Sequence, residues 1–357
     1  MLRRLLVLLT TTAAVAACGS SPAGPSDPPP TSAPAITCPV DQTAQVDLTP
    51  ATITYPTPTI SGGSTPVNQQ CSLASGSLFP SGTSNVTCTA TDSTQRTAQC
   101  SFKVTVTVVP KLLGTRFLAF GDSITWGETA AAIPQTLSNI LDFDPINNYP
   151  VVLANFLQQR YTKQTIDMRP RGVQGENATN PAAEQRLVDE VSAVQPDVLL
   201  LMEGYNDNNL FVSPDAIASS LRADVIRARQ RGVKKIFLST LIPQSTCAFA
   251  PCRNFNPSGV EDVNARIRDV AFKEGVVLVD NWAAFNPVKP LAIGVDGLHP
   301  TIEGYKLMAQ TFLASIQANF EEPLPAASTA GFMRLLAPPA SSQGQAATSV
   351  ARSTGRR

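Results

Sequence analysis

The stretch FLAFGDSIT (residues 117–125) joins a short apolar run to a turn that contains a serine. Similar runs recur through the second half of the chain, separated by longer segments with the period of amphipathic helices. The predicted strands are 116–120, 165–168, 198–202, 235–239 and 276–279, and the predicted helices are 149–160, 182–194, 214–230, 260–273 and 302–320. Because strands and helices alternate, we expect an α/β fold whose parallel sheet is covered by helices on both faces.

Ser123 follows the carboxyl end of the first of these strands, where open α/β sheets bind their ligands. The chain has no GxSxG pattern, which excludes the common nucleophile elbow. In DGLHP (residues 296–300), an aspartate precedes a histidine by three residues. Asp296 can orient the ring of His299 in a tight loop, so that the second ring nitrogen takes the Ser123 hydroxyl proton. By itself, such a pair is also typical of a helix cap or a loop.

Two further segments favour a catalytic interpretation. Asn206 lies just after the apolar strand 198–202, and its side-chain amide is a neutral donor suited to an oxyanion. Gly175 follows another predicted strand, and glycine allows backbone N–H groups to approach a ligand closely. Taken singly, each segment is equally compatible with a turn or a cap.

These segments form four ordered blocks between residues 113 and 320: GDSIT with Ser123, GVQGE with Gly175, GYND with Asn206, and DGLHP with Asp296 and His299. The set resembles the SGNH, or GDSL-type, hydrolases. The resemblance implies a flavodoxin-like three-layer α/β/α fold and ester hydrolysis through an acyl-serine, without a metal or cofactor. It also implies a Ser123–His299–Asp296 triad, and an oxyanion hole formed by the backbone N–H groups of Ser123 and Gly175 with the Asn206 side chain.

One position departs from the pattern of these hydrolases. Many members carry asparagine five residues before the oxyanion glycine, where this chain has Pro170. The change removes no catalytic group, but it puts the local support of the glycine loop in doubt.

Residues 36–110 are rich in threonine, valine and serine and contain short alternating runs, which predict a small antiparallel sandwich. Cys38, Cys71, Cys88 and Cys100 can form disulfides in any of three pairings. The region resembles the hyalin-repeat (HYR) module through CP (38–39), GSLFPSG (76–82), VTCTATD (86–92) and CSFKVTV (100–106). This resemblance implies an immunoglobulin-like spacer without catalytic chemistry; binding of a cell-surface ligand is the alternative.

The two ends of the chain have the composition of export and linker segments. Residues 1–18 resemble a bacterial lipoprotein signal that ends in VAAC, and we expect Cys18 to be lipidated. Residues 19–35 form a Pro/Ser-rich tether, the hydrolase domain covers 111–321, and 322–357 is a disordered tail. Six cysteines then remain for three disulfides, with Cys247 and Cys252 closing a small loop. These features predict an exported protein that a lipid anchors to the cell envelope, in the periplasm or at the cell surface.

The composition narrows the possible functions. The 27 basic and 27 acidic residues cancel, which disfavours a nucleic-acid partner. His299 is the only histidine, which excludes multi-histidine metal sites and leaves no second histidine base. We therefore expect a serine esterase acting on a small-molecule, lipid or glycan ester. The alternatives are a lysophospholipase or lipase, a carbohydrate O-acetyl esterase, and a noncatalytic surface protein that binds glycans.

Overall fold

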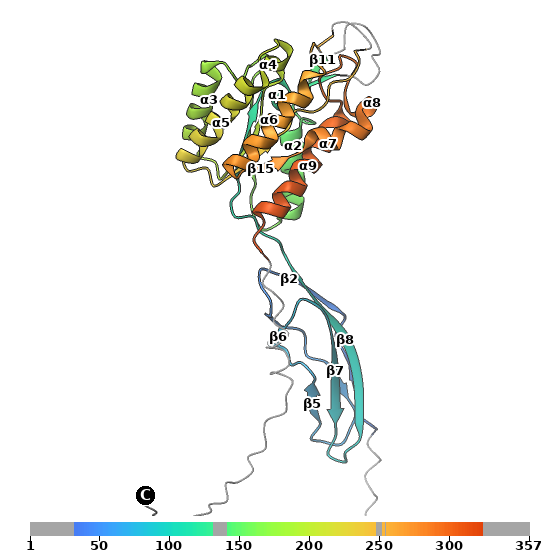
Figure 1. Cartoon of the computed structure of the whole chain (residues 1–357). Helices are drawn as coiled ribbons and strands as arrows, with labels where there is room; N and C mark the ends of the chain where they lie inside the picture. The colour runs from blue at the N-terminus through green and yellow to red at the C-terminus, as the bar shows by residue number, and fades with distance from the viewer. Residues whose placement is uncertain (1–31, 131–140, 248–251, 254, 324–357) are drawn as a thin grey trace, which may run out of the picture. The chain divides into compact units, whose positions relative to one another are not determined.

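The computed structural model describes residues 32–130, 141–247, 252–253 and 255–323 (Figure 1). The predicted signal peptide, Cys18, most of the tether and nearly all of the C-terminal tail lie outside the described residues. The chain forms two compact units. The smaller unit lies within the first 104 residues, and the larger contains the α/β region.

The N-terminal region is built from β-strands, most of which have five residues or fewer. They are β1 (Ala35–Thr37), β2 (Gln42–Val46), β3 (Ala51–Ile53), β4 (Thr59–Ser61), β5 (Asn68–Cys71), β6 (Ser77–Phe79), β7 (Gly82–Thr91) and β8 (Thr97–Val108). Strands β2-β8-β7-β5 form one sheet, and β1-β4 and β3-β6 form two-stranded sheets. In β7 and β8, inward residues such as Val86, Phe102 and Val104 are buried and alternate with more exposed ones. The predicted sandwich is confirmed.

Two disulfides connect these strands. Cys71 and Cys88 face each other across the β5–β7 pair and are bonded, and Cys38 is bonded to Cys100. The structure thus selects one of the three pairings that the sequence left open. Both bonds restrict the unfolded chain more than the folded one and thereby stabilise the fold.

The α/β region contains a parallel sheet with the strand order β12-β9-β13-β14-β15. The strands are β9 (Arg116–Gly121), β12 (Asp167–Gly172), β13 (Val198–Met202), β14 (Lys235–Ser239) and β15 (Val277–Val279). In chain order this is 2-1-3-4-5, the flavodoxin-like arrangement, which confirms the predicted fold class.

Strand β12 differs most from its prediction, because it extends from Asp167 to Gly172 rather than over 165–168. Pro170 lies inside it and pairs with Ala119 of β9. Proline has no backbone N–H to donate to a neighbouring strand. An edge strand such as β12 tolerates it, because one side of an edge strand has no neighbour to pair with. The glycine loop therefore follows a regular strand despite the proline.

The long helices match the predictions to within one residue at each end. They are α2 (Tyr149–Arg160), α3 (Pro181–Val194), α5 (Pro214–Gln230), α6 (Gly259–Glu274) and α9 (Ile302–Phe320). The sequence did not predict the short elements α1 (Ser123–Trp126), α4 (Tyr205–Asn209), α7 (Asn281–Phe285), η1 (Asn286–Val288), α8 (Lys289–Ala292) and the hairpin β10 (Glu128–Ala130) with β11 (Leu141–Phe143). None of them is long enough to show a helical or strand period.

The helices form two groups. Helix α2 packs against α9, and α5 packs against both α3 and α6, with the sheet between the groups (Figure 1).

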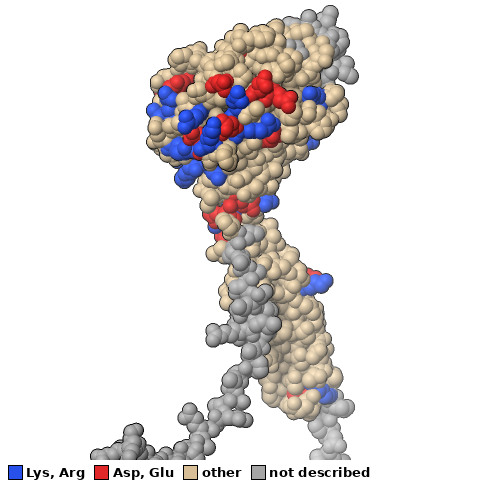
Figure 2. Space-filling view, in the orientation of Figure 1, with Lys and Arg blue, Asp and Glu red and all other residues tan. Residues whose placement is uncertain are grey.

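Charges of both signs are interspersed on the face of the α/β unit shown in Figure 2. Some pair across helices, as Arg222 does with Glu274 and Arg266 with Asp215. Among the described helices, none has the length and apolar character needed to cross a bilayer.

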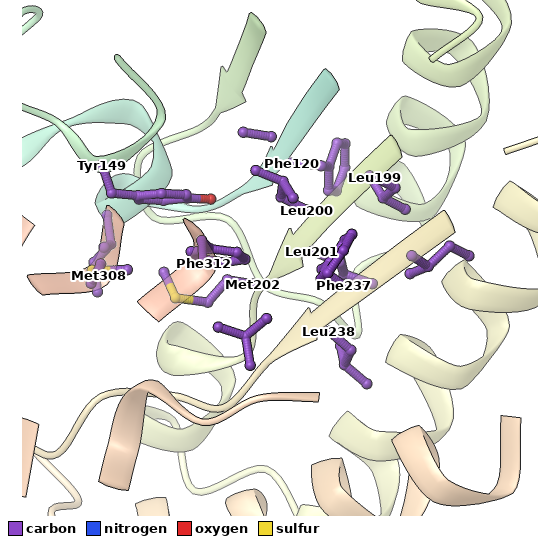
Figure 3. Close-up of a cluster of buried hydrophobic side chains, with 14 of the residues drawn as sticks. Phe120, Tyr149, Leu199, Leu200, Leu201, Met202, Phe237, Leu238, Met308 and Phe312 are labelled. Atoms are coloured by element: carbon purple, nitrogen blue, oxygen red, sulfur yellow. The ribbon is translucent and has the colours of Figure 1, made fainter. Parts of the chain in front are cut away.

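The hydrophobic core of the α/β unit holds the ends of the central strands in place (Figure 3). Every residue of β13 is buried, and Phe120, Phe237 and Leu238 of the flanking strands are buried beside it. Tyr149 of α2 stacks on Phe312 of α9, with ring centroids 5.1 Å apart. Because this packing holds the strands, the residues that follow β9 and β13 have fixed positions.

Candidate active site

Ser123 lies in a turn that is packed tightly between two strands. The Asp122 carboxylate caps α1 by accepting the Ile124 N–H at 3.0 Å. A Cβ on Gly121 would lie 2.3 Å from the carbonyl oxygen of Met202, and one on Gly172 would lie 2.0 Å from the Trp126 nitrogen. Glycine at both positions therefore lets the serine turn contact the ends of β13 and β12.

The serine, histidine and aspartate predicted from the sequence come together. Ser123 Oγ lies 3.0 Å from His299 Nε2, and His299 Nδ1 lies 2.6 Å from Asp296 Oδ2. The other oxygen of Asp296 accepts the backbone N–H groups of Leu298 and His299. Asp296 is fully buried and His299 nearly so. An Nδ1–H donated to the carboxylate leaves Nε2 free to accept the serine proton.

Gly175 and Asn206 line the same pocket as Ser123 and His299. Gly175 has a φ of +71°, and Gly204, which precedes α4, has a φ of +118°. The Asn206 Nδ2 donates one hydrogen to the Glu176 carbonyl at 2.8 Å. Because a side-chain amide has two hydrogens, the second can be donated to an oxyanion.

The glycine loop is supported from α4 rather than by an asparagine at position 170. The Asp207 carboxylate accepts the backbone N–H of Ala178 at 2.7 Å and that of Thr179 at 3.0 Å. Asp207 is fully buried. The aspartate of the GYND block therefore supports the glycine loop, although position 170 carries a proline and no asparagine.

The pocket has a volume of about 500 Å³ and contains polar residues that the sequence analysis did not identify, of which Glu128 and Gln174 lie nearest the predicted motifs in the sequence. Glu128 Oε2 lies 3.6 Å from His299 Nε2 and accepts a hydrogen bond from Gln174 Nε2 at 2.9 Å. Gln174 lies inside the GVQGE block and Glu128 follows the GDSIT block closely, which is the signal that could have found them. The lining residues are Ser123, Glu128, Gln174, Gly175, Asn177, Asn206, Asn209, Leu210, Arg253, Phe255, Leu298 and His299.

Cys247 and Cys252 are bonded, as the sequence predicts. On one side of this bond, the Ser245 N–H donates to the Gly297 carbonyl at 2.9 Å. On the other side, the Arg253 N–H donates to the Asp296 carbonyl at 3.0 Å. The residues on both sides of the disulfide therefore hold the loop that carries Asp296 through backbone hydrogen bonds.

Within the described part of the chain, no group of three or more His, Cys, Asp or Glu side chains is placed to hold a metal ion.

Residues 119–307 match the profile of the GDSL-like Lipase/Acylhydrolase family, and this match covers more than half of the chain. The chain belongs to this family. The HYR domain profile matches residues 29–106 of this GDSL-like hydrolase. Both resemblances proposed from the sequence are confirmed.

An acetylxylan esterase from Geobacillus stearothermophilus is 26% identical over 218 residues, which cover 57% of this chain and 94% of that protein. Among solved structures, the M. smegmatis aryl esterase gives a TM-score of 0.47 at 18% identity, covering 57% of this chain and 99% of that one. The acetylxylan esterase Axe2 from G. stearothermophilus gives 0.46 at 24% identity, covering 60% and 100%. The family match and the acetylxylan esterase relative support an SGNH serine esterase that hydrolyses ester bonds, as the sequence predicts.

Proposed function

We propose that this GDSL-like hydrolase removes short acyl groups from carbohydrate esters. Ser123 Oγ attacks the ester carbonyl carbon while its proton passes to His299 Nε2, and Asp296 stabilises the imidazolium that forms. The N–H groups of Ser123 and Gly175, with the Asn206 amide, stabilise the oxyanion. The alcohol then leaves with the proton from Nε2, and water releases the acid from the acyl-serine by the same steps.

The observation that carries this proposal is the polar lining beside the nucleophile. Glu128, Gln174, Asn177, Asn209 and Arg253 bring carboxylate, amide and guanidinium groups into the pocket. Such groups fix the orientation of a ligand through hydrogen bonds, and a sugar offers a hydroxyl to each of them. Apolar side chains among the described lining residues are few, whereas a long acyl chain requires continuous apolar surface. The 26% identical acetylxylan esterase supports the same substrate class.

An acyl-chain series tests the proposed substrate. We expect kcat/KM to fall by about tenfold or more from 4-nitrophenyl acetate to the octanoate. Each buried methylene needs apolar contact worth about 0.8 kcal/mol, and only Leu210, Phe255 and Leu298 among the described lining residues offer it. The protein should also release acetate from an acetylated xylo-oligosaccharide, as followed by chromatography. Rates that rise with chain length, together with turnover of a lysophospholipid, would support the lipase-like alternative instead.

We also propose that the protein is exported and anchored to the cell envelope through a lipid on Cys18, with the HYR module connecting this anchor to the hydrolase. The residues VAACG at 15–19 and the three disulfides support this location. We expect Cys18→Ser to move the protein from the membrane fraction of expressing cells to the soluble fraction, as shown by immunoblotting. Cys38→Ser, which removes a different cysteine, should leave the folded fraction on the membrane. Equal membrane retention of Cys18→Ser would contradict the anchor.

A further inference from the structure

A second, smaller pocket adjoins the catalytic pocket. It has a volume of about 250 Å³, and its described lining residues are Trp126, Glu128, Asp142, Phe143 and Gln174. Glu128 and Gln174 also line the catalytic pocket, so the two pockets meet at these side chains. Sites that hold drug-sized ligands measure about 300–1,000 Å³, and the smaller volume here suits a single sugar ring.

The hairpin of β10 and β11 forms one wall of the second pocket. Glu128 of β10 lies directly opposite Phe143 of β11. Residues directly opposite each other in an antiparallel pair point to the same face, so the carboxylate and the ring lie on one side of the hairpin. The Thr129 hydroxyl and the Ala130 N–H donate to the Pro300 carbonyl, at 2.9 and 3.2 Å. The hairpin is therefore attached to the DGLHP block that carries the catalytic histidine.

Two stacked aromatic rings line this pocket. The rings of Trp126 and Phe143 have centroids 4.0 Å apart and an interplanar angle of 27°. Phe143 is 42% exposed, so part of its surface is open to a ligand. A sugar ring has apolar C–H groups on its faces, and removing such a face from water against an aromatic ring is favourable. Its hydroxyl groups lie around the ring edge, where they can reach carboxylate and amide groups.

The second pocket begins on the leaving-group side of the ester. Glu128 Oε2 lies 3.6 Å from His299 Nε2, the atom that returns the proton to the departing alcohol in the proposed mechanism. The alcohol part of the ester therefore lies beside Glu128, and the group attached to it continues toward Phe143. Glu128 Oε2 already accepts a hydrogen bond from Gln174 Nε2 at 2.9 Å. An ionised carboxylate can accept several hydrogen bonds, so it has capacity for a sugar hydroxyl as well.

The charged residues of the second pocket favour a neutral ligand over an anionic one. Glu128 and Asp142 are both acidic, and no lysine or arginine is among the described residues that line this pocket. A sugar carboxylate would place a further negative charge beside these two, which is unfavourable. Uncharged hydroxyl groups, in contrast, can donate hydrogen bonds to carboxylates.

We propose that the second pocket is a subsite for a neutral sugar residue next to the one that carries the ester, with Phe143 as its stacking platform. The hydrolase then acts on acylated oligosaccharide or polysaccharide chains in preference to acylated single sugars. The inference rests on the carbohydrate esterase function proposed above and adds a second binding position to it.

The test compares acetate release from mono-O-acetylated xylotetraose and mono-O-acetylated xylose by the full-length wild type, Phe143→Ala and Phe143→Tyr. In the wild type we expect kcat/KM to be about fivefold or more higher for the tetraose ester, because its neighbouring ring contacts Phe143. Phe143→Ala should reduce this preference to within about twofold of unity and leave kcat/KM for the xylose ester within about twofold of wild type. Phe143→Tyr keeps the ring face and should keep the preference.

A control variant and an inhibition assay accompany this comparison. Phe272 of α6 is 87% exposed and is not among the described residues that line either pocket, so Phe272→Ala should keep both rates. Unacetylated xylotetraose should inhibit the hydrolysis of methyl acetate competitively and more strongly than xylose does, and Phe143→Ala should weaken this inhibition. The inhibition should not depend on salt concentration, because the ligand is neutral.

Three results would overturn the inference: equal kcat/KM for the two sugar esters in the wild type, a wild-type preference in Phe143→Ala, or an equal loss on both sugar esters in Phe143→Ala. If the wild type releases acetate from neither sugar ester, the proposed carbohydrate esterase function itself fails. If it deacetylates both esters and Phe143→Ala behaves like wild type, only this inference fails.

Discussion

Replacing Ser123 with alanine is expected to lower kcat for 4-nitrophenyl acetate by roughly 10⁴- to 10⁶-fold, as losses of serine nucleophiles do elsewhere. The reason is the 3.0 Å contact between Ser123 Oγ and His299 Nε2, which makes this hydroxyl the one that the histidine can deprotonate. Alanine removes only the Oγ, so the fold should be unaffected. Initial rates at saturating ester measure the loss, and circular dichroism confirms folding.

A matched control separates this loss from general damage. Ser192 is an exposed serine of α3 whose hydroxyl donates to the Val188 carbonyl within the same helix. Ser192→Ala should retain the wild-type kcat, because this serine lies outside the pocket. If Ser123→Ala turned over ester at a rate near that of Ser192→Ala, Ser123 would not be the nucleophile.

Replacing His299 with alanine is expected to produce a loss of similar size, roughly 10⁴-fold or more. The chain contains no other histidine, so no second imidazole can take over the proton transfer. The substitution removes a ring that lies between Ser123 and Asp296. Free imidazole at about 0.1 M should therefore restore part of the rate. The restored part should be small, because this concentration is well below the effective molarity of a bound base. Stopped assays with and without imidazole measure the rescue.

Two outcomes bear directly on the role of His299. Imidazole should leave the wild type and Ser123→Ala unchanged, because the first has its base and the second lacks its nucleophile. Near wild-type turnover by His299→Ala without imidazole would show that another group deprotonates the serine. Glu128, whose Oε2 lies 3.6 Å from His299 Nε2, would then be the first candidate.

The sequence alone predicted the long helices, the central strands of the sheet and the candidate site residues that follow those strands. The run 198–202 is apolar throughout and β13 is buried throughout, so its strand bounds were predicted correctly. Ser123 and Asn206 follow two strands that are neighbours in the sheet, β9 and β13. Because parallel strands place their carboxyl ends on one edge, a correct prediction of these strands also brought the two residues together.

What the sequence did not predict depends on contacts between distant segments. The pairing of Cys71 with Cys88 depends on the register of β5 on β7, which composition does not reveal. Arg186 reads as one more charge on an amphipathic helix, yet it donates to the carbonyls of Gly121 and Arg171. Glu203 has the sequence context of an ordinary polar residue after a strand, yet it is 1% exposed and its Oε1 lies 3.6 Å from Arg186 Nη2.

The proposed mechanism is tested most directly by covalent labelling with a fluorophosphonate, followed by mass spectrometry of the intact protein and of its peptides. An activated serine attacks phosphorus and expels fluoride, which leaves a phosphonylated oxygen. We predict a single adduct on Ser123 in the wild type, no adduct in Ser123→Ala, and strongly slowed labelling in His299→Ala. An adduct on another residue, or no adduct on a protein that still hydrolyses esters, would contradict the proposed mechanism.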